Sequence, residues 1–363
     1  MFFTEISDLK KTLSALQQET SVKALLLLMA DAQETEPSEL QSLLSLNNKP
    51  LLGGIFPELI ANGERQNTGF LLMPLHHDIK VVTFQQENAA SISKIQSDEV
   101  LESEGQAKSV FCFVNALWTG KNTFINTLYN ELGPMVNYLG GGAGSLSFTS
   151  FPCVFANQSI IEHGAVIGLM NTPFSIGVAH GWHAISEPIK VTETQGNTIV
   201  SLNWKPAFEV YKAHVKEHAN QTLTADNFFD VAKAYPLGLL RLDDEMIIRD
   251  PYATSEGHLH IVDQVPEGDY IRIMHGNTTS LLEGARLAVV ASQNPDEKNN
   301  TQFCIDCISR VLFMQEDFSQ ELQLLNTQQE AQGILSIGEI ANPAQTALEL
   351  FNKTVVVAQW EDK

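Results

Sequence analysis

SVFCFVNALW (109–118) is an apolar run that is followed by a helix-like segment, NTFINTLYNELG (122–133), and by two more apolar runs, VNYLGGGAG (136–144) and GAVIGLM (164–170). The apolar runs have the length of buried strands rather than of helices. The whole stretch therefore predicts a β-α-β-β unit in which the second strand carries a cluster of glycines.

The same order of segments occurs twice more in the chain. An earlier copy comprises VKALLLLMAD (22–31), PSELQSLLSL (37–46), PLLGGIF (50–56) and GFLLMPL (69–75). A later copy comprises CIDCISRVLFM (304–314), DFSQELQLLNTQQE (317–330), GILSIGEIAN (333–342) and TVVVAQW (354–360). Gly140 follows Gly53 by 87 positions, and Phe111 follows Ala24 by the same interval, so we expect the first two copies to be in register. Self-similarity of this kind predicts an architecture of repeated units.

We expect an α+β (α/β-layered) fold whose β-α-β-β repeats form mixed sheets covered by helices. The helical stretch after residue 205 separates two halves, an N-terminal domain over 22–205 with two repeats and a C-terminal domain over 206–358 with the third. Two alternating runs within 258–275, joined by Val265-Pro266-Glu267-Gly268, predict a hairpin in the second half. Residues 86–108 are polar and acidic, which indicates a solvated helix or a loose connector.

The charge of the chain limits its partners. The 363 residues carry a formal net charge of −21, which argues against binding to nucleic acid or to an anionic membrane surface. No apolar run approaches the roughly 18 residues of a membrane-spanning helix. The N-terminus lacks the order of a secretory signal, and four cysteines form no disulfide framework. We therefore expect a cytoplasmic protein.

An ordered set of segments resembles the FIST family of bacterial sensory proteins, which have an N-terminal and a C-terminal FIST domain. The segments are LGGIFPELIANG (52–63), YLGGGAGSLSFTSFPCVFANQSIIEHGAVIGL (138–169), GVAHGWHAISEPIKVTETQGNTI (177–199), PAFEVY (206–211), YPLGLL (235–240), IIRDP (247–251), VPEGDYIRI (265–273), CISR (307–310), GILSIGEI (333–340) and FNKTVVV (351–357). Together they cover nearly the whole chain.

The resemblance implies a sensor of small ligands, amino acids among them. Some stand-alone members are haem proteins that sense nitric oxide and act on a partner histidine kinase, and this sequence shows no kinase or receiver segment of its own. The most specific expectation is therefore a sensor that binds haem b, detects nitric oxide and regulates a histidine kinase by contact. One alternative is a sensor of an amino acid or other metabolite without haem. An unrecognised enzyme is a second alternative, although no GxSxG, HExxH or kinase signature indicates catalytic residues.

A haem would need an axial ligand within an apolar pocket. His180 and His183 lie in GVAHGWH (177–183), a family-like segment whose glycines allow close backbone approach. Their separation of three residues puts them on opposite faces of a strand, so only one could bind a given iron. His180 is the first candidate for metal ligand, with a hydrogen-bonded core or rim histidine as the plainer interpretation.

Further candidate residues lie in family-like segments. Arg249 and Arg310 could bind a ligand carboxylate or a haem propionate, or pair with internal acids such as Asp250. Polar side chains within apolar strands and glycines at strand ends could line a ligand pocket, or could serve packing between the repeats. The residues of this second group are Glu339, Asn352, Gly53 and Gly141.

The remaining histidines and cysteines carry weaker indications. His214 and His218 have helical i, i+4 spacing, and His275 adjoins a glycine at a strand end. Cys304 and Cys307 form a CxxC sequence without a second pair, which favours buried structural cysteines over zinc. If the repeats pack around a shared centre, the ends of LGGIF, YLGGGAG and LSIGEI should face one cavity, with His180 and Arg249 nearby.

Overall fold

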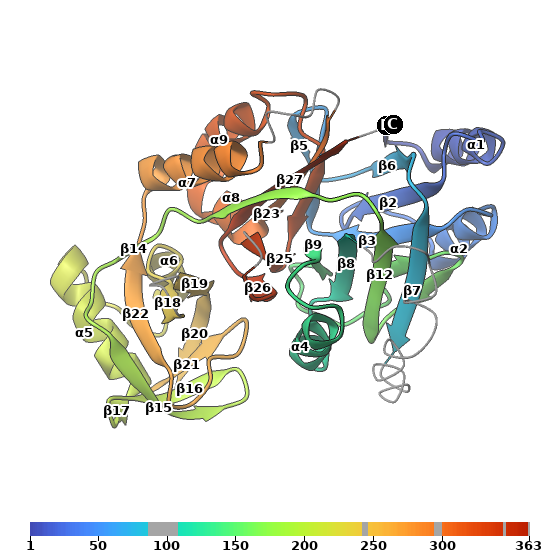
Figure 1. The fold of residues 1–363 in the computed structure, drawn as a ribbon. Coiled ribbons are helices and arrows are strands. Elements are labelled where there is room, and N and C mark those ends of the chain that lie inside the picture. Colours follow the sequence, from blue (N-terminus) through green and yellow to red (C-terminus); the bar gives the residue numbers. More distant parts are fainter. Residues whose placement is uncertain (86–107, 242–245, 294–299, 344–345, 362–363) are drawn as a thin grey trace.

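The computed structural model describes residues 1–85, 108–241, 246–293, 300–343 and 346–361 (Figure 1). The chain folds into a mixed α/β structure with three six-stranded sheets and one nine-stranded sheet. This confirms the predicted fold class. The polar connector predicted for 86–108 lies almost entirely outside the described residues.

The three repeats share one strand arrangement. The first contains β2 (Ala24–Ala30), α2 (Pro37–Ser45), β3 (Leu51–Phe56) and β6 (Phe70–Leu75). The second contains β8 (Ser109–Asn115), α4 (Lys121–Leu132), β9 (Asn137–Ala143) and β12 (Gly164–Met170). The third contains β23 (Asn300–Cys307), α8 (Ile308–Met314), η3 (Gln315–Asp317), α9 (Phe318–Leu325), β24 (Gly333–Ser336) and β27 (Val355–Glu361). In each repeat the first strand is parallel to the second and antiparallel to the last.

The structure corrects two details of this prediction. The run 304–314 is not one strand, because β23 ends at Cys307 and the following residues bury Ile308, Val311 and Met314 at helical spacing. Gly53 lies opposite Leu27 and Gly140 lies opposite Cys112, so equivalent positions of the first strands are 85 rather than 87 residues apart. The interval from the opposite residue of the first strand to the glycine is 28 positions in the second repeat and 26 in the first, and the helix of the second repeat is also longer, 12 residues against 9.

A hairpin after the second strand of each repeat joins the sheet of a different repeat. The hairpins are β4–β5 (Glu58–Ala61, Glu64–Gln66), β10–β11 (Val154–Ala156, Ser159–Ile161) and β25–β26 (Glu339–Ala341, Glu349–Phe351). The first pairs with β24, the second with β3 and the third with β9, so the exchange is cyclic. Because each hairpin covers an edge that would otherwise be open, the three repeats depend on one another.

An outer strand completes the opposite edge of each of these sheets. These strands are β1 (Phe2–Phe3) on β6, β7 (Ile79–Gln85) on β12 and β13 (Ser175–Ala179) on β27. The third repeat is therefore joined by backbone hydrogen bonds to segments from the first two. All three sheets follow the same plan.

The fourth sheet lies to the left of the repeats in Figure 1 and is covered by α5 (Ala207–Ala219) and α6 (Phe228–Ala232). Its strands are β14 (His183–Ala184), β15 (Ile189–Gln195), β16 (Thr198–Leu202), β17 (Lys205–Pro206), β18 (Leu237–Leu240), β19 (Met246–Arg249), β20 (Pro251–Ser255), β21 (His258–Ile261) and β22 (Tyr270–His275). The hairpin predicted within 258–275 is wrong, because β15 and β16 lie between β21 and β22. The amide of Gly268 donates to the carbonyl of Val191 on β15, so the turn connects to that strand instead.

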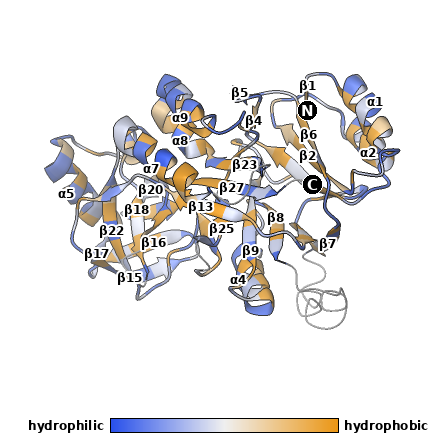
Figure 2. Cartoon of the chain, turned by 45° about the horizontal axis from the view of Figure 1, so that its top comes forward, coloured by the Kyte–Doolittle hydropathy of each residue, from blue (hydrophilic) through white to orange (hydrophobic). Residues whose placement is uncertain are grey.

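The remaining helices follow from apolar spacing and capping. Helix α1 (Ile6–Leu16) buries Leu9, Leu13 and Leu16, which share one face at helical spacing. Helix α7 (Thr278–Ala291) begins at a capping box formed by Asn277 and Ser280. Figure 2 shows apolar strands in the interior and helices such as α1 and α5 with one hydrophilic face.

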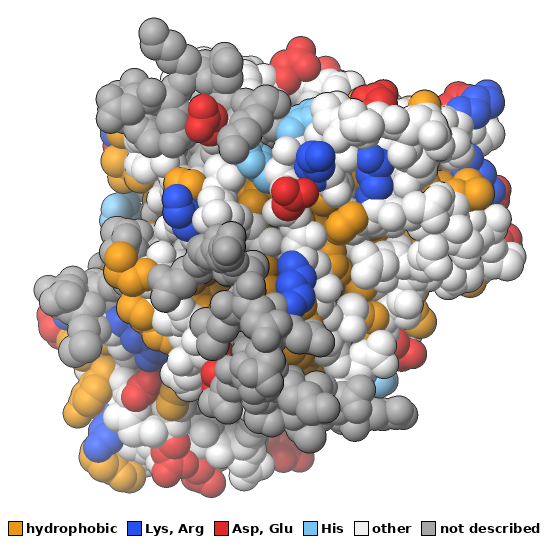
Figure 3. Space-filling model, turned by 45° about the vertical axis from the view of Figure 1, so that its right-hand side comes forward, with side chains coloured by type: hydrophobic (Ala, Val, Ile, Leu, Met, Phe, Trp, Pro, Cys, Tyr) orange, Lys and Arg blue, Asp and Glu red, His pale blue; other side chains and the backbone are white. Residues whose placement is uncertain are grey.

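The distribution of basic side chains is relevant to binding of nucleic acid, and the length of the helices is relevant to crossing a membrane. On the face shown in Figure 3, Lys and Arg side chains lie singly among acidic and uncharged ones rather than in a continuous stripe. Within the described ranges, no helix combines the length and apolar character needed to cross a bilayer.

Candidate functional site

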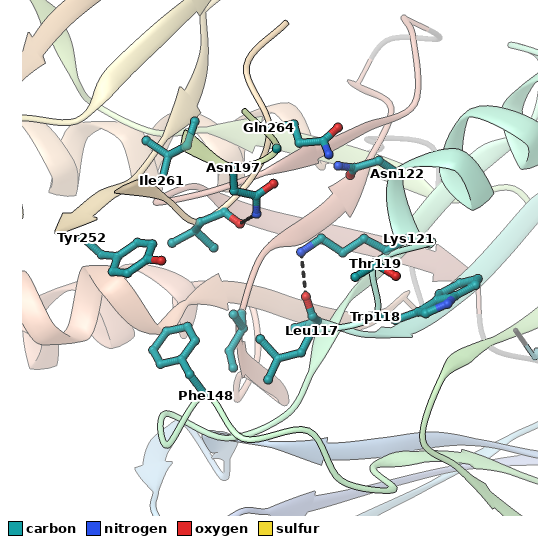
Figure 4. Close-up of a pocket in the computed structure, with 14 residues that line it drawn as sticks. Leu117, Trp118, Thr119, Lys121, Asn122, Phe148, Asn197, Tyr252, Ile261 and Gln264 are labelled. Carbon is teal, nitrogen blue, oxygen red and sulfur yellow. Dashed lines mark hydrogen bonds between the residues drawn. The ribbon is translucent and has the colours of Figure 1, made fainter. Parts of the chain in front are cut away.

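A cavity of about 610 Å³ lies where the second repeat meets the fourth sheet (Figure 4). Its lining residues come from the β8–α4 connection, the loop after β9, the fourth sheet and the segment after β24. They are Ala116, Leu117, Trp118, Thr119, Lys121, Asn122, Phe148, Gly196, Asn197, Tyr252, Ile261, Val262, Gln264 and Ile337. The size is within the usual range for small-molecule sites.

The β8–α4 connection is held by a buried side chain. Asn115 accepts a hydrogen bond from the amide of Leu117 at 2.9 Å and donates to the carbonyls of Phe151 and Glu162. Helix α4 then begins with Gly120 as N-cap, and no side chain caps its first turn. Its N-terminus therefore brings the positive end of the helix dipole to the cavity wall.

A buried ion pair lies beside the cavity. The Nζ atom of Lys121 is 2.7 Å from Oδ1 of Asp263 and donates to the carbonyl of Ala116. The other oxygen of Asp263 accepts from Nδ2 of Asn352 at 2.8 Å. Burial raises the pKa of Asp263, but the positive charges of Lys121 and Arg249 outweigh it, so the net pKa is lowered and the carboxylate stays ionised. This pair connects α4 to the segment after β21.

Two aromatic rings stand at another part of the wall. Phe148 and Tyr252 have ring centroids 6.4 Å apart and planes inclined by only 13°. Figure 4 shows these rings on one side of Lys121, while the amides of Asn122 and Gln264 point toward one another on another side. The wall thus combines apolar ring faces with amides that can both donate and accept hydrogen bonds.

His180 and His183 lie in a different cavity of about 460 Å³, beside α7, Met246 and Thr354. Nδ1 of His180 accepts from the amide of Trp182 at 2.9 Å, and the ring also hydrogen-bonds the backbone of Met246. Burial, with a contribution from the charge of Arg310, lowers the pKa of His180 to about 4, so the ring is neutral at pH 7.

Binding of a haem iron by His180 would require a change in its present hydrogen bonds. The His180 ring is held by hydrogen bonds to backbone, so its use as an iron ligand would require at least one of them to be broken. The side chain of His183 is exposed at the end of the fourth sheet, where it lies opposite His275. The larger cavity offers no histidine, cysteine or methionine among its lining residues.

Arg310 and Glu339 lie in the buried interior rather than in the larger cavity. Arg310 makes a two-pronged bond to Glu321, at 2.8 and 2.6 Å, and donates to the carbonyl of His180. Glu339 accepts from Ser336 and lies opposite Gly141 across β25 and β9. Burial raises the pKa of Glu339 to about 8. These contacts stabilise the junction between the third repeat and its neighbours.

Arg249 and Gly53 also make internal contacts. The guanidinium of Arg249 donates to the carbonyls of Gln264, Ile248 and Leu350, and burial lowers its pKa. It does not bond Asp250, whose carboxylate accepts from Ser309 and pairs with Lys353. A Cβ atom at Gly53 would lie 1.9 Å from the carbonyl oxygen of Leu27, so this glycine serves strand packing.

The expectation that three strand ends face one cavity is wrong for two of them. Of these three strand ends, only that of the third repeat contributes to the larger cavity, through Ile337. At the shared centre the backbones bond to one another: the amide of Gly144 donates to Ile55, and that of Gly142 donates to Gly338. The space left by the missing glycine side chains is therefore occupied by neighbouring backbone.

The other candidate histidines and cysteines lie outside the larger cavity. The rings of His218 and His275 lie 4.5 Å apart, although they come from different elements. Cys304 and Cys307 are buried, and burial raises the pKa of Cys304 to about 12. Among the residues that the structure describes, no three His, Cys, Asp or Glu side chains are grouped to hold a metal ion.

Sequence reasoning missed most of the residues around the larger cavity. Lys121 and Asn122 follow a predicted strand at the start of a helix, and that position is the main clue the sequence offers. Phe148 and Gln264 lie outside helices and strands and Tyr252 lies on β20, and no sequence motif marks any of the three as a ligand contact. Their approach depends on how the fourth sheet packs against the second repeat.

Two family models match the chain. Residues 24–205 match the model of the FIST N domain, and residues 207–342 match that of the FIST C domain. No curated protein matches the chain.

Proposed function

The chain belongs to the FIST family, whose domains are small-ligand-sensing domains of signal transduction, and we propose that its own ligand binds in the cavity between the second repeat and the fourth sheet. The ligand is a small polar metabolite, with amino acids in this class. Binding there is passed on to a partner protein.

One observation carries this proposal: both matched regions contribute to the cavity wall. Lys121, Asn122 and Phe148 belong to the FIST N region, whereas Tyr252 and Gln264 belong to the FIST C region. A ligand that contacts both walls favours the conformation in which they are correctly spaced. Ligand binding is thereby converted into a change in domain arrangement that a partner can detect.

The chemistry of the wall favours a polar ligand. The uncapped N-terminus of α4 suits a carboxylate or another anionic group. The side-chain amides of Asn122 and Gln264 make no hydrogen bond to another residue of the described chain. They can therefore hydrogen-bond a ligand. The proposal assigns binding to this wall, since its amides and ring faces supply hydrogen bonds and apolar contact.

The proposed partner is a histidine kinase, and the proposed location is the cytoplasm. Both follow from the family resemblance. Co-purification of the chain with a kinase, and a change in kinase autophosphorylation when the chain and its ligand are added, are the expected results.

The alternative is a haem-based sensor of nitric oxide, with His180 as the axial ligand. The smaller cavity holds His180, His183 and Met246, but the hydrogen bonds of His180 place this alternative second. Reconstitution with haem followed by an absorption spectrum tests it. A Soret band that shifts with nitric oxide and disappears in His180→Ala would replace the metabolite proposal.

A thermal-shift screen against amino acids and other small polar metabolites tests the leading proposal. A ligand that binds the native state raises Tm, by an amount that grows with its concentration relative to Kd. Asn122→Ala should remove that rise, because it deletes an amide in the cavity. Asn130→Ala, on the same helix but outside the cavity, should retain it. Equal loss or equal retention in the two variants would contradict the assigned site.

A further inference from the structure

Phe148 and Tyr252 are unusually exposed for large aromatic side chains, at 53% and 47%. They come from different parts of the fold, since Phe148 lies in the loop after β9 and Tyr252 lies on β20. Their rings are nevertheless nearly parallel, and both belong to the wall of the larger cavity. Two half-exposed, nearly parallel rings at a cavity wall leave aromatic surface that a ligand can contact.

Each of the two aromatic residues lies at a local irregularity of the backbone. Phe148 has φ of 51°, in the left-handed region that bulky residues rarely adopt, and its amide donates to the carbonyl of Ser145. Pro251 lies opposite Ile261 and Ala253 lies opposite His260, so Tyr252 is the extra residue of a β-bulge. Bulges often redirect a side chain next to a functional site. Strain and a bulge that converge on one pair of rings point to a role for that pair.

The amides of Asn122 and Gln264 supply a complementary edge. Figure 4 shows them approaching one another from α4 and from the segment after β21, away from the two rings. A carboxamide offers a donor and an acceptor side by side, which matches the edge of a heterocycle that carries both. Ring faces and amide edges together fit a flat ring with polar atoms on its rim.

We propose that the cavity binds a planar heteroaromatic ligand of the nucleobase or nicotinamide type, with its face against Phe148 and Tyr252 and its polar edge against Asn122 and Gln264. This inference rests on the proposed function, because it names the ligand class of the same cavity. Stacking of a base on an aromatic side chain tolerates many ring types, so the rings set planarity and the amides set orientation.

Matched pairs of probes test planarity directly. Uracil and 5,6-dihydrouracil carry the same hydrogen-bonding groups, but only uracil is flat. Benzamide and cyclohexanecarboxamide form a second pair with one carboxamide each, and nicotinamide and adenine are further planar probes. Calorimetric titration should give tighter binding of at least one planar probe, by about tenfold or more over its saturated counterpart. Equal affinity within both pairs, or no binding of any planar probe at millimolar concentration, would overturn the inference.

Variants then locate the effect. Tyr252→Leu and Phe148→Leu keep an apolar side chain but remove the ring, and each should weaken binding of the planar probe by about tenfold. Tyr270→Leu is the matched control, because Tyr270 has the same 47% exposure and lies on β22 of the same sheet, outside the cavity. Loss of affinity in Tyr270→Leu comparable with that in Tyr252→Leu would contradict a role for the ring pair.

The result also separates this inference from the proposed function. If an aliphatic amino acid raises Tm in an Asn122-dependent way while no planar probe binds, the cavity is a ligand site and the heteroaromatic assignment is wrong. If neither class binds, both proposals fail. Binding of a planar probe that depends on Tyr252 but not on Tyr270 supports both.

Discussion

Gly140 of β9 lies directly opposite Cys112 of β8, so close that a Cβ atom on the glycine would fall 1.6 Å from the carbonyl oxygen of the cysteine. The other repeats reproduce this relationship. A Cβ at Gly53 would lie 1.9 Å from the carbonyl of Leu27, and one at Gly333 would lie 1.8 Å from that of Cys304. A glycine on the second strand is therefore a shared structural requirement of the three repeats.

Gly140→Ala should destabilise the fold strongly, by about 3 kcal/mol or more, because backbone of β8 and β9 must move apart. Gly268→Ala is the control, since no atom lies within 4 Å of its added Cβ and only the cost of a left-handed backbone, about 1 kcal/mol, applies. Urea unfolding measures both variants. Similar losses would show that the close approach to Cys112 does not determine stability.

The repeat structure was predictable because the apolar runs are long and end in recognisable glycines. Every residue of β2 and β8 is buried, so these strands read as continuous apolar segments. The cyclic exchange of hairpins was not predictable. The exchanged strand β10 contains only three residues, and nothing local in such a strand specifies that β3 is its partner. The hairpin predicted around residues 265–268 does not form, because β22 pairs with β15 and not with β21.

Lys121→Met should cost about 3–5 kcal/mol, because it leaves the carboxylate of Asp263 buried without its cation. Lys121→Met combined with Asp263→Asn should recover part of this loss, since neither charge of the ion pair remains. A double-mutant cycle of chemical unfolding measures the coupling. Additive losses would mean that the two side chains do not stabilise one another.

Arg310→Lys should weaken the interior substantially, by about 2–4 kcal/mol, because a lysine cannot reproduce the two-pronged bond to Glu321 and the carbonyl contacts. Arg286→Lys is the matched control, as Arg286 makes a similar two-pronged bond to Glu283 on the exposed face of α7. It should change little. Comparing the decrease in Tm of the two variants tests whether burial makes the Arg310–Glu321 pair more stabilising than the exposed pair.

Glu339 should make stability depend on pH. Its pKa is raised from 4.5 to about 8, so the folded protein keeps a proton that the unfolded chain loses between these values, and rising pH favours unfolding. Glu339→Gln removes this group, so the unfolding free energy of the variant relative to wild type should increase from about pH 4.5 to 8 and then level off. The opposite slope that His180 contributes below pH 6.5 is present in both proteins and cancels. A flat difference would contradict the raised pKa.

The site was harder to predict than the fold. Arg310 and Glu339 drew attention because charged residues in apolar strands are rare, but their partners, Glu321 and Ser336, satisfy them internally. The cavity residues are ordinary in sequence. Asn122 and Gln264 gain significance only because two segments far apart in the chain meet, and that meeting is a property of packing.

The most direct test of the central claim measures the affinity of one ligand for variants of both cavity walls. A ligand identified by thermal shift should bind about tenfold or more weakly to Asn122→Ala, in the FIST N region, and also to Gln264→Ala, in the FIST C region. Asn130→Ala on α4 and Gln323→Ala on α9 should bind as wild type. Loss from both walls is the predicted result. Full affinity in either cavity variant would contradict a ligand site shared by the two domains.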